Sequence, residues 1–269
     1  MPASDVLCEV VDGVAVVTLN RPGRKNAWTY EMEPVFFDAL DACDEDPEVR
    51  AIVITGAGDA FCAGMDMAAL GELSQRKERT DLAWRTRPMT HARDLRKPTV
   101  AAINGACAGI GLALAVSCDV RFAAAGAKIA PSFTRRGLPA EFGVSWLLTR
   151  LIGPGHAADL LISSRTILAE EALAMGLVNR VVPAGDVLAA ACDYARDLAA
   201  NCSPRAMAFV KVQLEADWHR SLAESRADAD RGVGDPDQRI DFREGVASFA
   251  ERRPPEFRPL GSREPGEDG

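Results

Sequence analysis

Two glycine-centred loops are the features of the sequence best suited to chemistry. The first covers residues 61–66 (FCAGMD) and the second covers residues 104–111 (NGACAGIG). Each loop follows a short apolar run that predicts a buried strand. A helix that opens near Gly109 has unpaired N–H groups and the positive end of its dipole at its start. Two such N–H groups that converge on one point form an oxyanion hole, which stabilises charge on a carbonyl oxygen.

Other kinds of site find little support in the sequence. Taken singly, neither loop is specific, and neither matches the GxGxxG pattern of dinucleotide-binding loops. No GxSxG motif surrounds Ser145, so a serine-hydrolase triad is not indicated. The three histidines are far apart and no CxxC pair occurs, so we predict no metal site. The seven cysteines are scattered and odd in number, which fits buried thiols in a reducing cytoplasm.

Composition and charge narrow the classes of function. The chain has 269 residues, of which 48% are hydrophobic and 26% charged, so a sizeable core is expected. A net charge of −8 gives no electrostatic support for binding nucleic acid or an anionic membrane. The sequence lacks a run of about 18 apolar residues and a basic start followed by an apolar stretch. We therefore expect a cytoplasmic protein without a transmembrane helix or signal peptide.

The elements that must position the two loops alternate between strands and helices. Strands are predicted at residues 14–19, 51–55, 99–103 and 120–123. Helices are predicted at residues 111–118 and at residues 30–43, where Thr29 is the expected N-cap. Beyond Gly153 helical patterns dominate, at residues 156–162, 169–175, 185–200, 204–219 and 235–252, with one strand at 178–182. The pattern predicts an α/β body followed by a helical C-terminal part.

Five blocks of the sequence, in order and at the right spacing, resemble the enoyl-CoA hydratase/isomerase (crotonase) family. They are VAVVTLNRPGRKNA (14–27), DAFCAGMDM (59–67), AAINGACAGIGLALAVSCDVRFA (101–123), LIGPGHAADLLISSRTILAEEALAMGLVNRVVP (151–183) and DFREGVASFAERRPPEF (241–257). The resemblance implies a spiral of ββα units with a helical C-terminal region. It also implies that residues 1–195 form the core with the acyl-CoA site. Residues 196–260 would serve oligomerisation and the pocket wall, and residues 261–269 are expected to be a disordered tail.

The resemblance also implies roles for individual residues. The oxyanion donors would be the backbone N–H groups of Met65 and Ile110. The residues expected beside coenzyme A are Arg24, Lys25, Ala27, Ala63, Gly64, Asp66 and Gly109. From the residues alone, Arg24 and Lys25 equally suit a solvated loop, and Asp66 suits a helix N-cap. No separate cofactor is expected, because coenzyme A arrives with the acyl-CoA thioester substrate. Homotrimers, or dimers of trimers, are the expected assemblies.

The sequence departs from the family at the residues used for hydration. Family hydratases activate water with two glutamates, and this chain has Ala113 and Phe133 at those positions. Neither side chain can transfer a proton. One carboxyl remains, that of Glu141, which matches the block where double-bond isomerases of the family carry their acid/base. We expect Phe133, Phe142 and Trp146 to give it an apolar pocket, which would raise its pKa. The alternative is that Glu141 caps a helix starting near Gly143.

Three functions are compatible with these residues. The first is isomerisation of an enoyl-CoA with Glu141 as the acid/base. The second is hydration or hydrolysis by other residues. The third is a non-catalytic acyl-CoA binder or carrier, which Ala113 and Phe133 would suit because they leave the pocket inert. Acyl chain length and pathway do not follow from the sequence.

Overall fold

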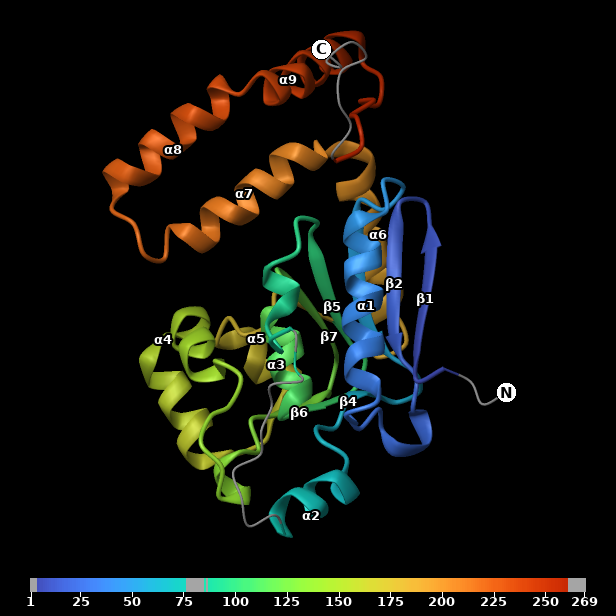
Figure 1. Ribbon diagram of the computed structural model, residues 1–269, viewed down its shortest axis with the longest axis vertical. Helices are drawn as coiled ribbons and strands as arrows, with labels where there is room; N and C mark the ends of the chain where they lie inside the picture. Colours follow the sequence, from blue (N-terminus) through green and yellow to red (C-terminus); the bar gives the residue numbers. More distant parts are fainter. Residues whose placement is uncertain (1–3, 76–84, 86, 261–269) are drawn as a thin grey trace.

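The computed structural model describes residues 4–75, 85 and 87–260, whose strands form two sheets (Figure 1). The larger sheet has the order β1-β2-β3-β5-β7-β10, made of Val6–Val11, Val14–Leu19, Ala51–Gly56, Thr99–Ile103, Val120–Ala124 and Arg180–Val182. The smaller sheet has the order β4-β6-β8-β9, made of Ala60–Cys62, Ala106–Ala108, Lys128–Ala130 and Ile167–Leu168. Except for the antiparallel pairs β1–β2 and β8–β9, neighbouring strands run parallel.

A ββα unit recurs three times along the chain. The units are β3-β4-α2, β5-β6-α3 and β7-β8-α4, with helices Met67–Gln75, Ile110–Ser117 and Val144–Ser163. In each unit the first strand joins the larger sheet and the second strand joins the smaller sheet. Each turn of the spiral therefore delivers one loop and one helix start to the smaller sheet. This arrangement confirms the predicted α/β fold.

The core lies around the central strands of the larger sheet. Strands β3 and β5 are buried along their whole length, as expected for parallel strands covered on both faces. Helix α1 (Met32–Glu45) covers one face and α6 (Val187–Asn201) covers the other (Figure 1). Val187, Ala191 and Ala195 of α6 recur at four-residue intervals and are all buried. That stripe is the amphipathic spacing of a helix that packs on a sheet.

The predicted elements are mostly present, with shifted ends. Strands β2 and β5 match their predicted bounds. The first helix starts at Met32, two residues later than predicted, although the Thr29 hydroxyl still accepts a bond from the Met32 N–H. The helix predicted at 156–162 is only the end of α4, which starts at Val144 and bends at Gly153, where φ is 74°. The glycine adopts this positive φ at little cost, so α4 consists of two helical segments joined at Gly153.

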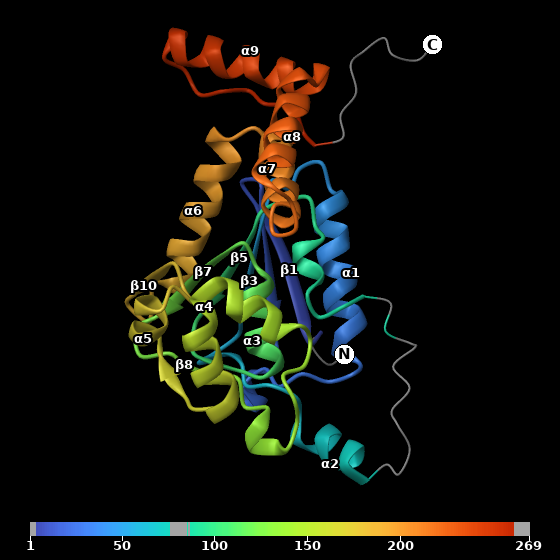
Figure 2. The same ribbon diagram turned by 90° about the vertical axis from the view of Figure 1, so that its left-hand side faces the viewer.

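The C-terminal helices extend away from the body, as Figure 2 shows. Helix α5 (Ala169–Ala174) lies against the smaller sheet, whereas α7 (Pro204–Ala216), α8 (Leu222–Gly234) and α9 (Pro236–Glu251) form the extension. Helix α8 was absent from the sequence prediction. Helix α6 spans the boundary drawn between residues 195 and 196, so the two regions share a continuous element. The division into these regions remains a prediction, and residues 261–269 lie outside the described residues.

Candidate active site

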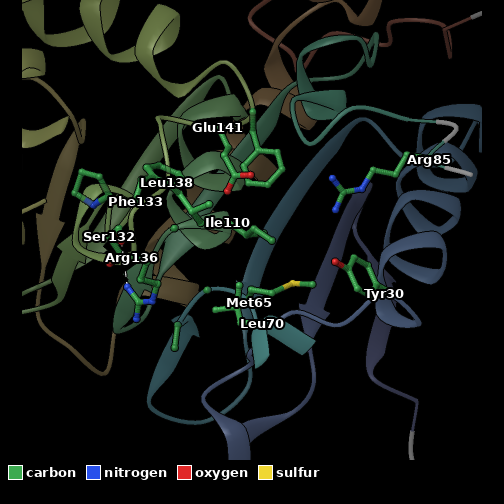
Figure 3. Close-up of a pocket in the computed structure, with 15 residues that line it drawn as sticks. Tyr30, Met65, Leu70, Arg85, Ile110, Ser132, Phe133, Arg136, Leu138 and Glu141 are labelled. Carbon is green, nitrogen blue, oxygen red and sulfur yellow. Dashed lines mark hydrogen bonds between the residues drawn. The ribbon is translucent and has the colours of Figure 1, made fainter. Parts of the chain in front are cut away.

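A cavity of about 330 Å³ lies where the two glycine loops meet the segment before α4. Ala63, Gly64 and Met65 line it from the first loop, and Gly109 and Ile110 line it from the second loop. The remaining wall is supplied by Tyr30, Leu70, Arg85, Pro131, Ser132, Phe133, Arg136, Leu138, Glu141 and Phe142. Figure 3 shows the Glu141 carboxyl directed into this space, on the same side as Ile110, while the Met65 side chain extends toward Tyr30. The two loops predicted from the sequence therefore share one pocket.

The turn at Gly64 orients the N–H of Met65. Gly64 has φ 103°, in the region that favours glycine. The Trp28 N–H donates to the Gly64 carbonyl, and the Asp66 N–H donates to the Trp28 carbonyl, each over 2.8 Å. Successive N–H groups of an extended segment point in opposite directions. The N–H of Met65 therefore points away from Trp28, on the other side of its strand.

The second loop ends at the start of α3. Gly109 has φ 53°, its N–H donates to the Ala130 carbonyl, and its own carbonyl accepts from Ala113 in the first turn of the helix. Ile110 is the first residue of α3, so its N–H has no intrahelical acceptor and lies at the positive end of the helix. Strands β4 and β6 pair at Cys62 and Cys107, which lie within the two loop segments. The ladder thus holds the two loops side by side.

Glycine is required where these elements touch. A Cβ added to Gly111, in the first turn of α3, would overlap the Cys62 carbonyl oxygen. A Cβ added to Gly105 would overlap the Asp59 carbonyl oxygen. The start of α3 can approach β4 this closely only because residue 111 has no side chain.

Glu141 is half-buried, and burial raises the pKa of its carboxyl while the nearby Arg85 charge lowers it. Its carboxyl makes no hydrogen bond or ion pair with the residues that the structure describes. The alternative reading, in which Glu141 caps a helix, is wrong, because the N-cap of α4 is Gly143 and only the backbone carbonyl of Glu141 accepts from Val144. Phe142 and Gly143 are both left-handed and turn the chain sharply between Glu141 and α4. The carboxyl is thereby left free over the cavity.

The residues at the two hydratase positions lie differently. Phe133 lines the cavity and is 4% exposed, whereas Ala113 is fully buried within α3 and is not among the described lining residues. Phe142 also lines the cavity, as predicted. Trp146 does not line it. Instead Trp146 packs on Trp218, with ring centroids 4.5 Å apart, because α4 turns its side chain toward the segment that follows α7.

The segment expected near coenzyme A lies beside the first loop. Arg24 and Lys25 are exposed, and Lys25 has φ 51° after a short 3-10 turn. The Ala63 N–H donates to the Lys25 carbonyl over 3.0 Å, and Arg21 donates to the Ala27 carbonyl. The two exposed cations are therefore carried next to the cavity, although neither lines it.

Asp66 caps α2. Its Oδ1 accepts from the Ala68 N–H over 3.0 Å, and its Oδ2 pairs with Arg21. The Ala68 hydrogen bond, with help from the Arg21 charge, lowers the pKa of Asp66. The N-cap interpretation of Asp66 is confirmed, and its contact with coenzyme A remains a prediction.

Sequence reasoning missed a buried ion pair at the wall of the cavity. Glu33 is 2% exposed and accepts from Arg85 at both carboxylate oxygens, over 2.7 and 3.0 Å. The Trp28 indole N–H also donates to Glu33. Figure 3 places Tyr30 and Arg85 on the wall opposite Glu141. Glu33 and Arg85 are 52 residues apart, so no local pattern could have paired them.

Two further observations concern the described part of the chain. No helix there is long and apolar enough to cross a membrane. No group of three or more His, Cys, Asp or Glu side chains there is arranged to hold a metal ion.

The fold and the pocket together define an α/β protein with a spiral of ββα units and a small-molecule site at two adjacent strand ends. Residues 9–259 match the family model described as enoyl-CoA hydratase/isomerase. A probable enoyl-CoA hydratase from Rhodobacter capsulatus is 38% identical over 254 residues, covering 93% of this chain and 96% of that protein. The chain belongs to the enoyl-CoA hydratase/isomerase family, whose members process acyl-CoA thioesters.

Solved structures agree with this assignment. A probable enoyl-CoA hydratase/isomerase from Mycobacterium abscessus is 35% identical, with a TM-score of 0.85, over 96% of this chain and 100% of that chain. An enoyl-CoA hydratase from Polaromonas sp. JS666 is 30% identical, with a TM-score of 0.87, over 94% and 99% of the two chains.

Proposed function

We propose that this protein isomerises the double bond of an enoyl-CoA, with Glu141 as the acid/base. The main support is that Glu141 is the one carboxylate among the described residues that line the cavity. Its carboxyl is unengaged and its pKa is raised by burial. A base of this kind accepts a proton more readily near neutrality than an exposed glutamate does. No cofactor is needed, because coenzyme A is part of the substrate.

The reaction needs one base and one site for negative charge. Glu141 removes a proton from the carbon between the thioester carbonyl and the double bond of a 3-enoyl-CoA. The electron pair moves onto the thioester oxygen, where the N–H groups of Met65 and Ile110 stabilise it as an enolate. Glu141 then returns the proton to the γ-carbon, and the electron pair comes back to form the 2,3 double bond. The proton and the electrons balance without any other reactant.

The first prediction concerns Glu141→Gln. Glutamine keeps the size of the side chain but cannot take up a proton, so we expect conversion of a 3-enoyl-CoA to fall by roughly 10²–10⁴-fold. Chromatographic separation of the two isomers would follow the reaction, and mass spectrometry in D₂O would show deuterium at the γ-carbon to the extent that the Glu141 carboxyl exchanges its proton with solvent before returning it. Glu45→Gln, on an exposed position of α1, is the matched control and should keep full activity. Unchanged turnover by Glu141→Gln would refute the proposal.

Hydration is the second candidate, because the relatives reported above carry the name hydratase. Ala113 and Phe133 argue against it, since neither can activate water. A 3-hydroxyacyl product from a 2-trans-enoyl-CoA would establish hydration and show that other groups hold the water. Bound acyl-CoA with no product from either substrate would instead favour a binder or carrier.

Arg24 and Lys25 are proposed to contact the phosphates of coenzyme A, with Ala27, Ala63, Gly64, Asp66 and Gly109 along the rest of that molecule. Both cations are exposed and lie next to the first loop. Contacts far from the reacting atoms serve the ground state and the transition state alike. We therefore expect Arg24→Gln/Lys25→Gln to raise KM several-fold with kcat retained. An unchanged KM would place the phosphates elsewhere.

A homotrimer, or a dimer of trimers, is proposed as the assembly. Helices α7 to α9 carry several exposed apolar side chains, among them Val233, Phe242 and Phe249, which is 88% exposed. Clusters of this kind usually mark an interaction surface. Sedimentation should show a trimer or hexamer that Phe242→Ser/Phe249→Ser shifts toward monomer, while Val11→Ser on β1 leaves it unchanged. A wild-type monomer at high concentration would contradict the proposal.

A further inference from the structure

Two cysteine sulfur atoms face each other far from the candidate active site. Cys8 lies on the edge strand β1 and Cys43 lies near the end of α1, and their Sγ atoms are 3.4 Å apart. The two residues are separated by 35 positions in sequence, so the fold alone brings them together. Cys8 is exposed and Cys43 is buried. The Cys8 thiol can therefore react with a reagent from solvent, and the buried Cys43 thiol lies next to it.

The two sulfurs differ in acidity because they share one hydrogen bond. The Cys43 thiol stabilises the Cys8 thiolate and lowers the pKa of Cys8 to about 7, against the opposing effects of burial and of the Asp46 and Glu9 charges. The same hydrogen bond, together with burial and the negative Cys8, raises the pKa of Cys43, and Lys97 opposes this only in part. The lowered pKa favours the thiolate form of Cys8, and the thiolate is the nucleophile in thiol oxidation.

The remaining cysteines lack this arrangement. Cys62, Cys107 and Cys118 are fully enclosed in the core, and burial raises the pKa of each thiol. Cys192 and Cys202 are half-buried, and burial raises the pKa of both. Among the described residues, Cys8 therefore combines exposure, acidity and a second sulfur within reach.

We propose that Cys8 and Cys43 form a redox modification site, which a peroxide converts to a reversible disulfide. The Cys8 sulfur attacks one oxygen of hydrogen peroxide, the O–O bond breaks, and the products are a sulfenic acid and water. The Cys43 sulfur then attacks the Cys8 sulfur, the S–S bond forms, and the S–O bond breaks to release a second water. Two thiols lose two electrons in total, and one peroxide gains them. A dithiol reductant reverses the reaction by exchange.

Closing this bond requires little movement. The sulfur atoms, now 3.4 Å apart, must approach to the S–S bond length of about 2.05 Å. The bond would join the edge strand of the larger sheet to the helix that covers it. A cross-link of this kind restricts the unfolded chain, so the oxidised protein should unfold at a temperature several degrees higher than the reduced protein.

Oxidation of the full chain with graded hydrogen peroxide tests the site directly. We expect a mass loss of about 2 Da, the expected loss of two hydrogens, a linked peptide containing Cys8 and Cys43, and recovery with dithiothreitol. Cys8→Ser should abolish the mass loss and the rise in unfolding temperature, and it should fold normally because position 8 is exposed. Cys202→Ser is the matched control and should leave both unchanged.

Three results would overturn the proposal. One is sulfinic or sulfonic acid at Cys8 without any intramolecular link. Another is a linked peptide that pairs Cys8 with a cysteine other than Cys43. The third is a dimer joined through Cys8, which gel filtration and non-reducing electrophoresis would separate from the intramolecular product.

Discussion

The Glu141 carboxyl is under two opposing influences, both of which come from residues around the cavity. Burial raises its pKa, and the positive Arg85 on the facing wall lowers it. Arg85 is itself held by the buried Glu33, so its charge is fixed in place instead of sampling solvent. The balance between the two influences sets the pH at which the base becomes available.

The pH dependence of isomerisation follows from this balance. The base must be ionised to remove a proton, so kcat/KM should fall as pH drops through the raised pKa, at a pH above the ordinary value of 4.5. Removing the Arg85 charge removes the lowering influence and should move this acid limb to higher pH. The double variant Glu33→Gln/Arg85→Gln serves best, because it leaves no buried carboxylate without its partner.

Arg196→Gln, on an exposed part of α6, is the control and should leave the profile in place. A limb that stays at the wild-type pH in the double variant would show that Arg85 does not act on the catalytic base.

Residues of the site were predictable to different degrees. The glycines identify the two loops, and the block around Glu141 resembles the block that carries the acid/base in double-bond isomerases of the family. Arg85 and Tyr30 could not be found, because each reaches the cavity through tertiary contacts that local sequence does not encode.

The approach of α3 to β4 is the feature that sets the site at the scale of elements. Gly111 lies against the backbone of Cys62, one residue after the proposed donor Ile110. Gly111→Ala adds a methyl group into a space that main-chain atoms already fill. Because backbone cannot move aside cheaply, we expect a loss of stability of about 1–3 kcal/mol. The displaced helix start should also lower kcat.

Gly155→Ala is the matched control for this prediction. Gly155 lies in α4 with nothing within 4 Å of its added Cβ, so alanine should be neutral or slightly stabilising there. Urea denaturation and turnover would be measured on both variants. A Gly111→Ala protein as stable and active as wild type would show that α3 can withdraw from β4 without cost.

Elements were predictable where their burial leaves a pattern. Strands β2 and β5 are continuous apolar runs, and α6 has a regular stripe. Strands β4, β6, β8 and β9 have two or three residues each, too few for any periodicity to register. Helix α8 is polar along most of its length, and its signal is the capping box of Ser221 and Glu224, which apolar spacing does not reveal.

At the scale of the whole molecule, Lys211 of α7 links the C-terminal helices to the body through hydrogen bonds and an ion pair. Its Nζ donates to the carbonyls of Ala92 and Lys97 and pairs with Asp119 over 2.8 Å, and its side chain is 10% exposed. Asp119 in turn accepts from the backbone and hydroxyl of Thr99 on β5. Asp119 therefore has a structural role, and nothing in the local sequence singles out its partner Lys211.

Lys211→Met tests this attachment. The variant keeps the length of the side chain but removes the donor to two carbonyls and the cation that pairs with Asp119, at a cost of about 1–3 kcal/mol. Limited proteolysis between α6 and α7 should accelerate, and the unfolding midpoint in urea should fall. Lys128→Met, at an exposed position on β8, should change neither. Equal proteolysis of the wild type and Lys211→Met would mean that apolar packing alone holds α7.

The pairing of β4 with β6 fixes the separation of the two oxyanion loops. Neighbouring strands in a ladder stand roughly 4.7–4.9 Å apart, so main-chain spacing sets the distance between the backbone N–H groups of Met65 and Ile110. Side chains around the cavity, including the one that acts on the substrate, can therefore change while the separation of the two N–H groups stays the same. Only a slip of register or melting of the small sheet would spoil it. Heat inactivation should then coincide with loss of that sheet. Unfolding of α7–α9 at a lower temperature should leave the separation of the two N–H groups unchanged.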